Sequence, residues 1–300
     1  MSTASTGTTA LAQPSSKFSG YLALTKPDVS FLVLMTTGAG YYMGARGSVS
    51  WLHLTHVVFA TMLIAAGTAA LNHYIERDSD RHMRRTASRP LPTGQLSPRE
   101  ALYFGFVLCA AGAIDLYVAA GYLPCLLGVL TSLSYLLAYT PLKKRTVWAT
   151  FIGAIPGAIP PMIGWTAATG KLDAGAWLLF AILFVWQFPH FHAIAWMYRE
   201  DYARAGILML PVVDKDGTRT FRQIILYAAT LIAVSLLPAV MGFAGVLYFF
   251  GALVTSVASL QVCLWAASAK TNIRAKWLMH ATVMHIPILL GLMMYDKIPR

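Results

Sequence analysis

The sequence has little charge. Only 12% of its 300 residues are Asp, Glu, Lys or Arg, and 57% are hydrophobic. Soluble domains carry about 25% charged residues, so this composition excludes an ordinary soluble protein and indicates a chain that lives in lipid. Acids are the scarcer sign, with 12 Asp and Glu against 23 Lys and Arg, and the net charge is +11. Such a surplus suits nucleic acid, anionic lipid or a phosphorylated substrate as partner.

Cysteine is also scarce, and its pattern predicts neither a zinc site nor a disulfide framework. The three cysteines lie in apolar runs without a CxxC pair, as Cys109, Cys125 and Cys263. No basic residue precedes Lys17, which argues against a signal or transit peptide. We expect a disordered tail over residues 1–20 and a single transmembrane domain over residues 21–300.

Long apolar stretches recur along the rest of the chain. A helix of about 17 to 25 apolar residues can cross the roughly 30 Å hydrocarbon core of a bilayer. The sequence therefore predicts an all-α, polytopic membrane protein with nine transmembrane helices. The predicted spans are 29–45, 57–75, 101–119, 122–140, 148–167, 175–196, 222–242, 245–267 and 277–295.

The basic residues fall on alternate sides of these spans. Nineteen of the 23 Lys and Arg lie in the N-terminal segment and every second loop after it. Those segments are 1–28, 76–100, 141–147, 197–222 and 268–276. Because cytoplasmic loops carry the excess of Lys and Arg, we expect the N-terminus inside and the C-terminus outside a bacterial inner membrane. No soluble basic domain remains that could bind nucleic acid.

Nine of the twelve acids lie on the same side as most of the bases. Mixed charge of this kind fits a solvated loop surface, or a site that handles a metal and an anion together. The densest stretch begins at Asn72. If a helix continues through it, Asn72, Glu76 and Asp80 follow one another at intervals of four and project from one face. Asp78 then points to the other side.

Two carboxylates and an amide on one face are hard oxygen ligands suited to Mg²⁺, which commonly bridges protein carboxylates to substrate phosphates. Arg85 and Arg89 follow, four residues apart, and their planar guanidinium groups can hold phosphate oxygens in pairs. The alternative is a loop that anchors to anionic lipid headgroups through its arginines. An anchor to anionic lipid has no use for acids interleaved among its arginines, nor for the amide of Asn72 within an apolar run. We therefore favour the metal and phosphate site.

At these residues the sequence resembles a known family. Asn-x3-Glu-x3-Asp resembles the first aspartate-rich motif of the UbiA-type intramembrane prenyltransferases. The continuation from Met83, Met-x-Arg-Thr-x-x-Arg-Pro-Leu-Pro-x-Gly, is similar to the branch that farnesylates protoheme IX. The pair Tyr139 and Lys143 resembles the family's Tyr-x3-Lys element, which implies that both contact the diphosphate. Lys26, on the same side of the membrane, is a further candidate for diphosphate binding.

The span at 148–167 cannot be a straight helix, because its prolines remove backbone donors. Irregular backbone at membrane depth is tolerated where it faces protein or a cavity. Small residues such as those at Gly153 and Gly157 also let helices pack closely. The segment is similar to the family's Gly-Ala-x-Pro-Pro span.

Histidines near the end of the sixth predicted span are candidates for binding heme. Gln187 and His190 share a face, and His190 could act as a general base or as a ligand or orienting group for a metalloporphyrin. His192 points elsewhere and has an ordinary packing role as its alternative. His280 is a possible heme neighbour near the last span. The run Trp-Gln-Phe-Pro-His-Phe is again similar to the heme-modifying branch.

The loop after this span departs from the wider family. Relatives that prenylate aromatic acceptors carry a second Asp-x3-Asp here, whereas this sequence has Tyr198 and Tyr202 at the corresponding positions. Glu200 and Asp201 are the carboxylates left to bind a second Mg²⁺. This departure argues against a symmetric two-metal clamp and points to the heme-modifying branch.

The resemblance implies an α-helical bundle whose cavity is capped by cytoplasmic loops. It implies transfer of the farnesyl group of farnesyl diphosphate to a vinyl group of protoheme IX (heme B), with Mg²⁺ as cofactor and a heme A synthase as a partner. The catalytic residues that we expect are Asn72, Glu76, Asp80, Arg85 and Arg89, and His190 is our hypothesis for the base of the water step.

Two alternatives stay open. An aromatic prenyl acceptor would keep the diphosphate half of the site and change the acceptor pocket; the missing second aspartate motif speaks against it. A transporter would also contain broken helices and intramembrane polar residues. It predicts ionisable groups near mid-membrane, whereas this chain places nearly all of them at one interface.

Overall fold

The computed structural model describes residues 16–299, so residues 1–15 of the expected tail lie outside the described part. The end of that expected tail, residues 17–20, belongs to the first helix. Over the described residues the chain is helical throughout, with an isolated β-bridge between Ala244 and Lys297. The elements are α1 (Lys17–Leu24), α2 (Pro27–Gly44), α3 (Trp51–Asp80), α4 (Pro98–Ala120), α5 (Tyr122–Leu133), the π-helix η1 (Ser134–Tyr139), α6 (Thr140–Leu142), α7 (Ala149–Ala158), α8 (Pro160–Thr169), α9 (Ala174–Met197), α10 (Arg199–Arg204), α11 (Leu210–Val213), α12 (Thr218–Val240), α13 (Val246–Ala269) and α14 (Asn272–Tyr295).

The predicted all-α membrane architecture is confirmed. Within residues 16–299, 8 helical units are long and apolar enough to cross a membrane. They are α3, α4, α5 with η1 and α6, α7 with α8, α9, α12, α13 and α14. The first predicted span, 29–45, falls on the 18-residue α2, which is not one of the eight. The count of nine is therefore not confirmed.

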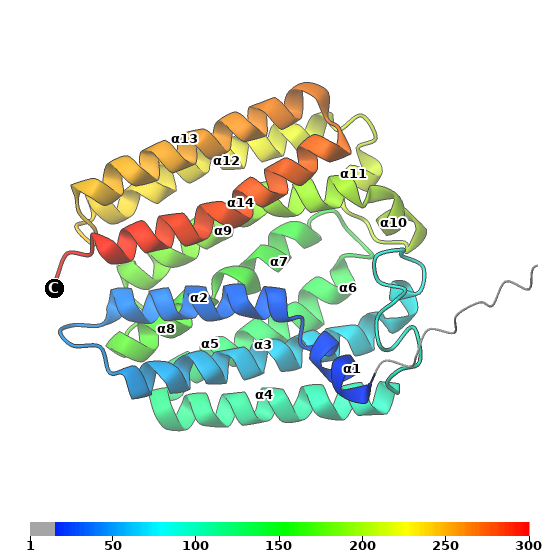
Figure 1. Ribbon diagram of the computed structural model, residues 1–300, viewed down its shortest axis with the longest axis horizontal. Coiled ribbons are helices and arrows are strands. Elements are labelled where there is room, and N and C mark those ends of the chain that lie inside the picture. The colour runs from blue at the N-terminus through cyan, green and yellow to red at the C-terminus, as the bar shows by residue number, and fades with distance from the viewer. Residues whose placement is uncertain (1–15, 300) are drawn as a thin grey trace, which may run out of the picture.

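Helices lie side by side along the long axis of the molecule (Figure 1). α3 packs along α4, α2 packs along α8, and α12 packs against both α9 and α13. α9 is the central helix, because 67% of its apolar window is buried, against 22% for α4. The span predicted to be irregular is broken at Ile159, where α7 ends and Pro160 begins α8.

Small residues permit the closest helix contacts. A Cβ added to Gly40 would lie 2.0 Å from the Pro161 carbonyl oxygen, so α2 and α8 meet backbone to backbone. A Cβ on Gly67 would lie 2.6 Å from the Gly105 carbonyl oxygen between α3 and α4. In lipid, where no hydrophobic effect drives helices together, such close packing supplies the association.

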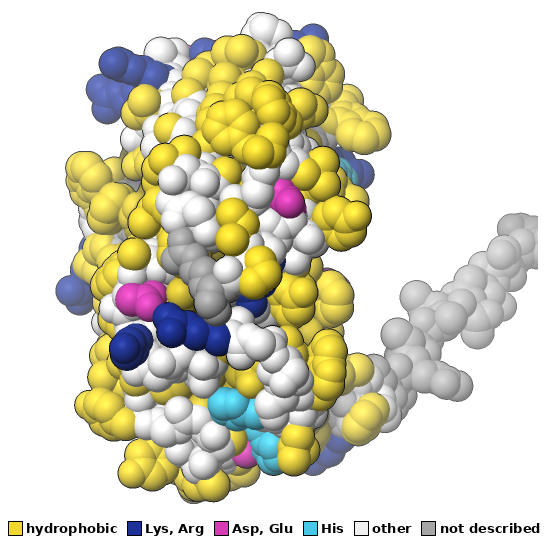
Figure 2. Space-filling view, turned by 90° about the vertical axis from the view of Figure 1, so that its left-hand side faces the viewer, with side chains coloured by type: hydrophobic (Ala, Val, Ile, Leu, Met, Phe, Trp, Pro, Cys, Tyr) yellow, Lys and Arg dark blue, Asp and Glu magenta, His cyan; other side chains and the backbone are white. Residues whose placement is uncertain are grey.

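The loops rich in Lys and Arg gather at one end of the bundle. α1, α6, α10, α11 and the loop after α3 all lie there, while the C-terminus lies at the other end (Figure 1). Figure 2 looks onto that other end, which is covered mostly by hydrophobic and neutral atoms; basic and acidic side chains lie next to one another near its middle, with histidine side chains below them. A polar site is therefore expected at the end of the bundle that carries α1, α6, α10 and α11.

The C-terminal segment caps a transmembrane helix. Gly245, which precedes α13, has no side chain, and Asp296 Oδ2 accepts a hydrogen bond from the Tyr248 N–H at 2.7 Å. We expect Asp296→Ala to lower the free energy of unfolding by about 1 kcal/mol, the usual cost of a lost N-cap. Thermal unfolding in detergent measures it. Asp78→Ala, at a largely exposed position, should leave the unfolding temperature unchanged; an equal loss in both variants would contradict the capping role.

Candidate active site

The polar end of the bundle contains a buried acid–base cluster. Asn72, Glu76 and Asp80 occupy the last three turns of α3, and each is at most 5% exposed. A base from another segment meets each one. The Lys26 Nζ donates to Asn72 Oδ1 at 2.8 Å, Lys143 is ion-paired with Glu76, and Arg89 Nη1 donates to both carboxylate oxygens of Asp80 at 2.8 and 2.9 Å. We call these six residues the acid–base cluster.

Lys26 enters the cluster from the turn between α1 and α2. Its φ is 47°, in the left-handed region that residues other than glycine rarely adopt, and Pro27 starts α2 immediately after it. Burial, and after it the positive charge of Arg89, lower the pKa of the Lys26 ammonium to about 7.

Lys143 enters from the end of η1 and α6. Pro141 has no N–H, and its ring would collide with the carbonyl of Leu137 in a regular α-helix. A wider π-turn avoids that collision, and the Thr140 N–H bonds the Tyr135 carbonyl instead. The Lys143 carbonyl accepts a hydrogen bond from the Leu208 N–H at 2.7 Å, which holds the segment after α10 above the cluster.

Arg89 comes from the compact loop between α3 and α4. Thr86 Oγ1 donates to the Asp80 carbonyl at 2.9 Å and folds the loop back over the end of α3. Leu91 and Leu96 anchor the loop in an apolar cluster with Leu24 of α1. The loop is thus fixed where Arg89 reaches Asp80.

The structure places Arg85 beside the cluster, toward α10. Its Nη2 donates to the Tyr202 hydroxyl at 3.2 Å, and its guanidinium carbon lies 4.8 Å from the Tyr198 ring centre. Burial raises the pKa of the Tyr202 hydroxyl. Asp201 is ion-paired with Arg204, and Glu200 is exposed. A cavity of about 400 Å³ lies here, lined by Arg84, Arg85, Met197, Tyr198, Glu200 and Asp201.

The three candidate heme histidines are not brought together. His190 stacks on Trp186, and its Nδ1 lies 2.9 Å from Thr282 Oγ1 of α14. His192 is buried, and its Nε2 has no hydrogen-bond partner within residues 16–299. His280 is exposed on the outside of α14, in edge contact with Trp277.

Sequence reasoning missed three residues near the cluster. Thr140 Oγ1 donates to the Tyr135 carbonyl at 2.8 Å and accepts from Asn72 Nδ2 at 3.4 Å, which turns the Asn72 oxygen toward Lys26. The ring of Tyr135 contacts that of Tyr139, with the ring centres 5.1 Å apart and the planes tilted by 44°. His73 is buried, and neither ring nitrogen has a hydrogen-bond partner in the described part of the chain. Helical spacing could have found His73, because it lies seven residues before Asp80 and so on the same face.

The oxygen ligands of the cluster are few. Residues 16–299 contain no group of three or more His, Cys, Asp or Glu side chains that could hold a metal, so no cage of such ligands is present there. Mg²⁺, however, usually takes one or two carboxylates and completes its shell with water and substrate phosphate. Glu76, Asp80 and the Asn72 oxygen, buried and ringed by bases, fit an ion that arrives with a diphosphate.

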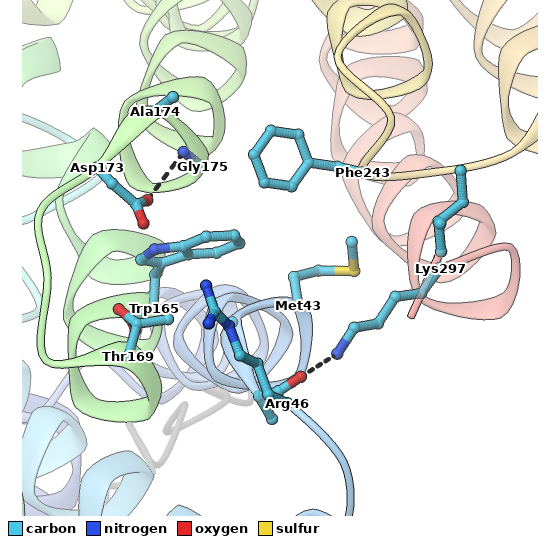
Figure 3. Close-up of a pocket in the computed structure, with 12 residues that line it drawn as sticks. Met43, Arg46, Trp165, Thr169, Asp173, Ala174, Gly175, Phe243 and Lys297 are labelled. Atoms are coloured by element: carbon cyan, nitrogen blue, oxygen red, sulfur yellow. Dashed lines mark hydrogen bonds between the residues drawn. The ribbon is translucent and has the colours of Figure 1, made fainter. Parts of the chain in front are cut away.

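A second cavity, of about 170 Å³, lies at the opposite end of the bundle (Figure 3). Trp165 and Phe243 line it, with their rings 5.5 Å apart. Two of its charged groups have structural roles: Lys297 Nζ donates to the carbonyls of Tyr42 and Ala45, and Asp173 caps the start of α9. This cavity is remote from the acid–base cluster.

A helical membrane bundle with acids, an amide and bases converging at one end defines an intramembrane enzyme of phosphorylated substrates. The UbiA prenyltransferase family matches residues 33–286, and the chain belongs to this family. Among its relatives are two proteins named protoheme IX farnesyltransferase. The protein of Solibacter usitatus is 49% identical, and the alignment covers 92% of this chain and 98% of that protein. The protein of Koribacter versatilis is 46% identical, and the alignment covers 92% of this chain and 93% of that protein. The resemblance seen in the sequence is confirmed.

Solved structures share the fold. A digeranylgeranylglyceryl phosphate synthase gives a TM-score of 0.76 at 18% identity and covers 93% of this chain and 98% of that one. A UbiA homolog from Archaeoglobus fulgidus bound to GPP and Mg²⁺ gives a TM-score of 0.64 at 15% identity and covers 91% of this chain and 99% of that one.

Proposed function

We propose that this chain transfers the farnesyl group of farnesyl diphosphate to a vinyl group of protoheme IX, yielding heme O and diphosphate. Relatives that are up to 49% identical over nearly their whole length bear the name of this activity. The observation that carries the proposal is the acid–base cluster, because a buried set of bases around hard oxygen ligands suits a metal-bound diphosphate. We further propose that this end of the bundle faces the cytoplasm of a bacterium, since it carries most of the Lys and Arg.

The cluster can stabilise the leaving group. Lys26, Arg89 and Lys143 oppose only two carboxylates, so the cluster is positive where the diphosphate would lie. As the C1–O bond of farnesyl diphosphate breaks, both electrons go to the diphosphate, and these bases stabilise the growing charge. A Mg²⁺ ion held by Asn72, Glu76 and Asp80 would supply further neutralisation of that charge. Arg89 and Lys143 then exchange their acidic partners, and Lys26 its amide partner, for phosphate oxygens.

His190 is the candidate base of the acceptor half. The vinyl carbon bonds to farnesyl C1, water adds to the resulting cation on the porphyrin side, and that water loses a proton. Thr282 Oγ1 donates to the Met279 carbonyl at 2.7 Å, so it must accept from His190 Nδ1–H. Nε2 then carries the lone pair of a neutral imidazole, which is the state that a base requires.

We expect His190→Phe to reduce heme O formation by about 10²-fold, the lower end of what a general base contributes. Binding of an unreactive farnesyl diphosphate analogue should be unchanged, because His190 serves only the acceptor half. His56→Phe, at a half-exposed position near the other end of α3, is the matched control and should keep full activity. A loss of analogue binding with His190→Phe would instead show a role in the diphosphate half.

One assay tests the proposed function. Purified protein is incubated with heme B, farnesyl diphosphate and Mg²⁺, and the pigments are separated and weighed by mass spectrometry. We expect a hydroxyethylfarnesyl heme and one diphosphate released per adduct. Prenylation of an added hydroxybenzoate with heme B left unchanged would overturn the heme acceptor, and transport without diphosphate release would overturn the enzyme.

A further inference from the structure

We propose that Arg85, held in place by Tyr198 and Tyr202, neutralises the diphosphate on the side away from α3 and takes the place of a second divalent ion. Tyr198 and Tyr202 are the positioning residues of this arginine. The inference rests on the proposed function, since it assumes that a prenyl diphosphate enters the acid–base cluster.

The guanidinium of Arg85 is fixed by two rings and one hydroxyl. Its central carbon lies 4.8 Å from the ring centre of Tyr198 and 5.7 Å from that of Tyr202. The Tyr202 hydroxyl accepts a hydrogen bond from Nη2 at 3.2 Å, and Tyr202 itself is buried. Stacking and a hydrogen bond hold the planar group without using up its charge.

Arg85 differs from Arg89 and Lys143 of the cluster in having no acid. Arg89 is paired with Asp80 and Lys143 with Glu76, whereas no carboxylate among residues 16–299 pairs with the guanidinium of Arg85. Asp201 accepts a hydrogen bond from the backbone N–H of Arg85, at 3.4 Å, and its ion pair is with Arg204. The Arg85 side chain is therefore a cation ready for an external anion.

The geometry connects Arg85 to the cluster on both sides. Along its own loop it lies four residues before Arg89, which holds Asp80. Across the site, Tyr202 packs with Met83 and Met209, and the neighbouring Leu208 N–H bonds the Lys143 carbonyl. Arg85 also lines the cavity of about 400 Å³, together with Arg84 and with the carboxylates of Glu200 and Asp201.

The same loop is poorly built for a second metal. Glu200 and Asp201 are adjacent on α10, so their side chains point about 100° apart, and a shared ion needs convergent ligands. Glu200 is exposed, and Arg204 already neutralises Asp201. Tyr198 and Tyr202, four residues apart, face the site instead and present Arg85 to it. We therefore assign Glu200 and Asp201 no metal, in place of the role expected from the sequence.

Counting bound Mn²⁺ tests the inference. Purified protein is saturated with farnesyl S-thiolodiphosphate, an unreactive analogue, and bound Mn²⁺ is measured by electron paramagnetic resonance. We expect one Mn²⁺ per chain, and two in the double variant Tyr198→Asp/Tyr202→Asp, which rebuilds a carboxylate pair. Two ions in the unchanged protein would overturn the inference alone. Failure of the analogue to bind at all would overturn the proposed function as well.

Tyr202→Phe tests the positioning role while it keeps the ring. We expect about tenfold weaker analogue binding at saturating Mn²⁺, the usual effect of losing a hydrogen bond to a charged group, with Mn²⁺ affinity and unfolding temperature unchanged. Arg85→Gln should weaken analogue binding by about 100-fold or more, and Arg85→Lys should restore only part of it. Tyr103→Phe, exposed on α4, is the control. Analogue binding that is unchanged in Tyr202→Phe and Arg85→Gln would overturn the assignment.

Discussion

Replacing Glu76 with glutamine should lower the rate of farnesyl transfer by about 10³-fold, at the upper end of what one preorganised electrostatic group contributes. Glu76 is 5% exposed and is the carboxylate paired with Lys143. Glutamine keeps the shape of the side chain and removes the charge that a divalent ion needs. The measurement is heme O formed per minute at saturating farnesyl diphosphate and Mg²⁺.

Asp78→Asn is the matched control. Asp78 lies two residues farther along α3, on the opposite face, with its side chain 72% exposed. The same chemical change there should leave the rate within about twofold, because a solvated carboxylate contributes little. If both variants lost activity equally, a general effect of charge at this end of α3 would replace the site that we describe.

A double variant separates folding from chemistry. Glu76→Gln leaves Lys143 buried without its counter-charge, which is destabilising in itself. Glu76→Gln/Lys143→Met removes both charges and should recover the unfolding temperature of the unchanged protein, but no activity. Recovered activity in the double variant would mean that Glu76 serves only to neutralise Lys143.

The sequence predicts one side of the cluster well and the other poorly. Asn72, Glu76 and Asp80 belong to one continuous helix, so local periodicity is enough to place them together. Their partners come from α1–α2, from α6 and from the loop after α3, and which base meets which acid depends on how those segments pack. Spacing alone predicts the same phosphate-binding role for Arg85 and Arg89. In the structure only Arg89 of the two bonds to an acid of α3, and Arg85 bonds to Tyr202.

Periodicity also does not determine which side of a helix faces the interior of the bundle. His280 and His285 both lie on α14, and no rule of spacing decides which side meets α9. Packing turns Thr282 and His285 inward and leaves His280 on the surface. The break in the fifth predicted span falls at the adjacent Pro160 and Pro161, where two neighbouring backbone donors are missing. A single proline does not suffice, because Pro189 stands inside the continuous α9.

The resting cluster explains how so many charges are tolerated in a membrane protein. Three bases held near one another without acids would repel strongly in a buried place. Asp80 and Glu76 remove that repulsion when no diphosphate is bound, and they are also the oxygens that suit a metal. The same carboxylates thus stabilise the fold and prepare the site, so their loss should affect both.

Substituting Gly164 with alanine should lower the free energy of unfolding by about 3 kcal/mol, the upper end of overpacking costs. An added Cβ would lie 1.9 Å from the Thr37 carbonyl oxygen and 2.6 Å from the Tyr41 N–H nitrogen, both backbone atoms of α2. Backbone cannot rotate away as a side chain can, so α8 and α2 must separate. Because Lys26 is the N-cap of α2, that separation should also disturb the acid–base cluster.

Gly291→Ala provides the comparison within α14. No heavy atom other than its own neighbours lies within 4 Å of the added Cβ, so alanine there should be neutral or stabilising by up to about 1 kcal/mol through its helix propensity. Thermal unfolding of both variants in the same detergent, followed by circular dichroism, gives the difference. Equal unfolding temperatures for Gly164→Ala and the unchanged protein would show that α2 and α8 do not meet backbone to backbone. A loss of analogue binding that accompanies the fall in unfolding temperature would tie this helix crossing to the diphosphate site, because α2 is the element that carries Lys26 to Asn72.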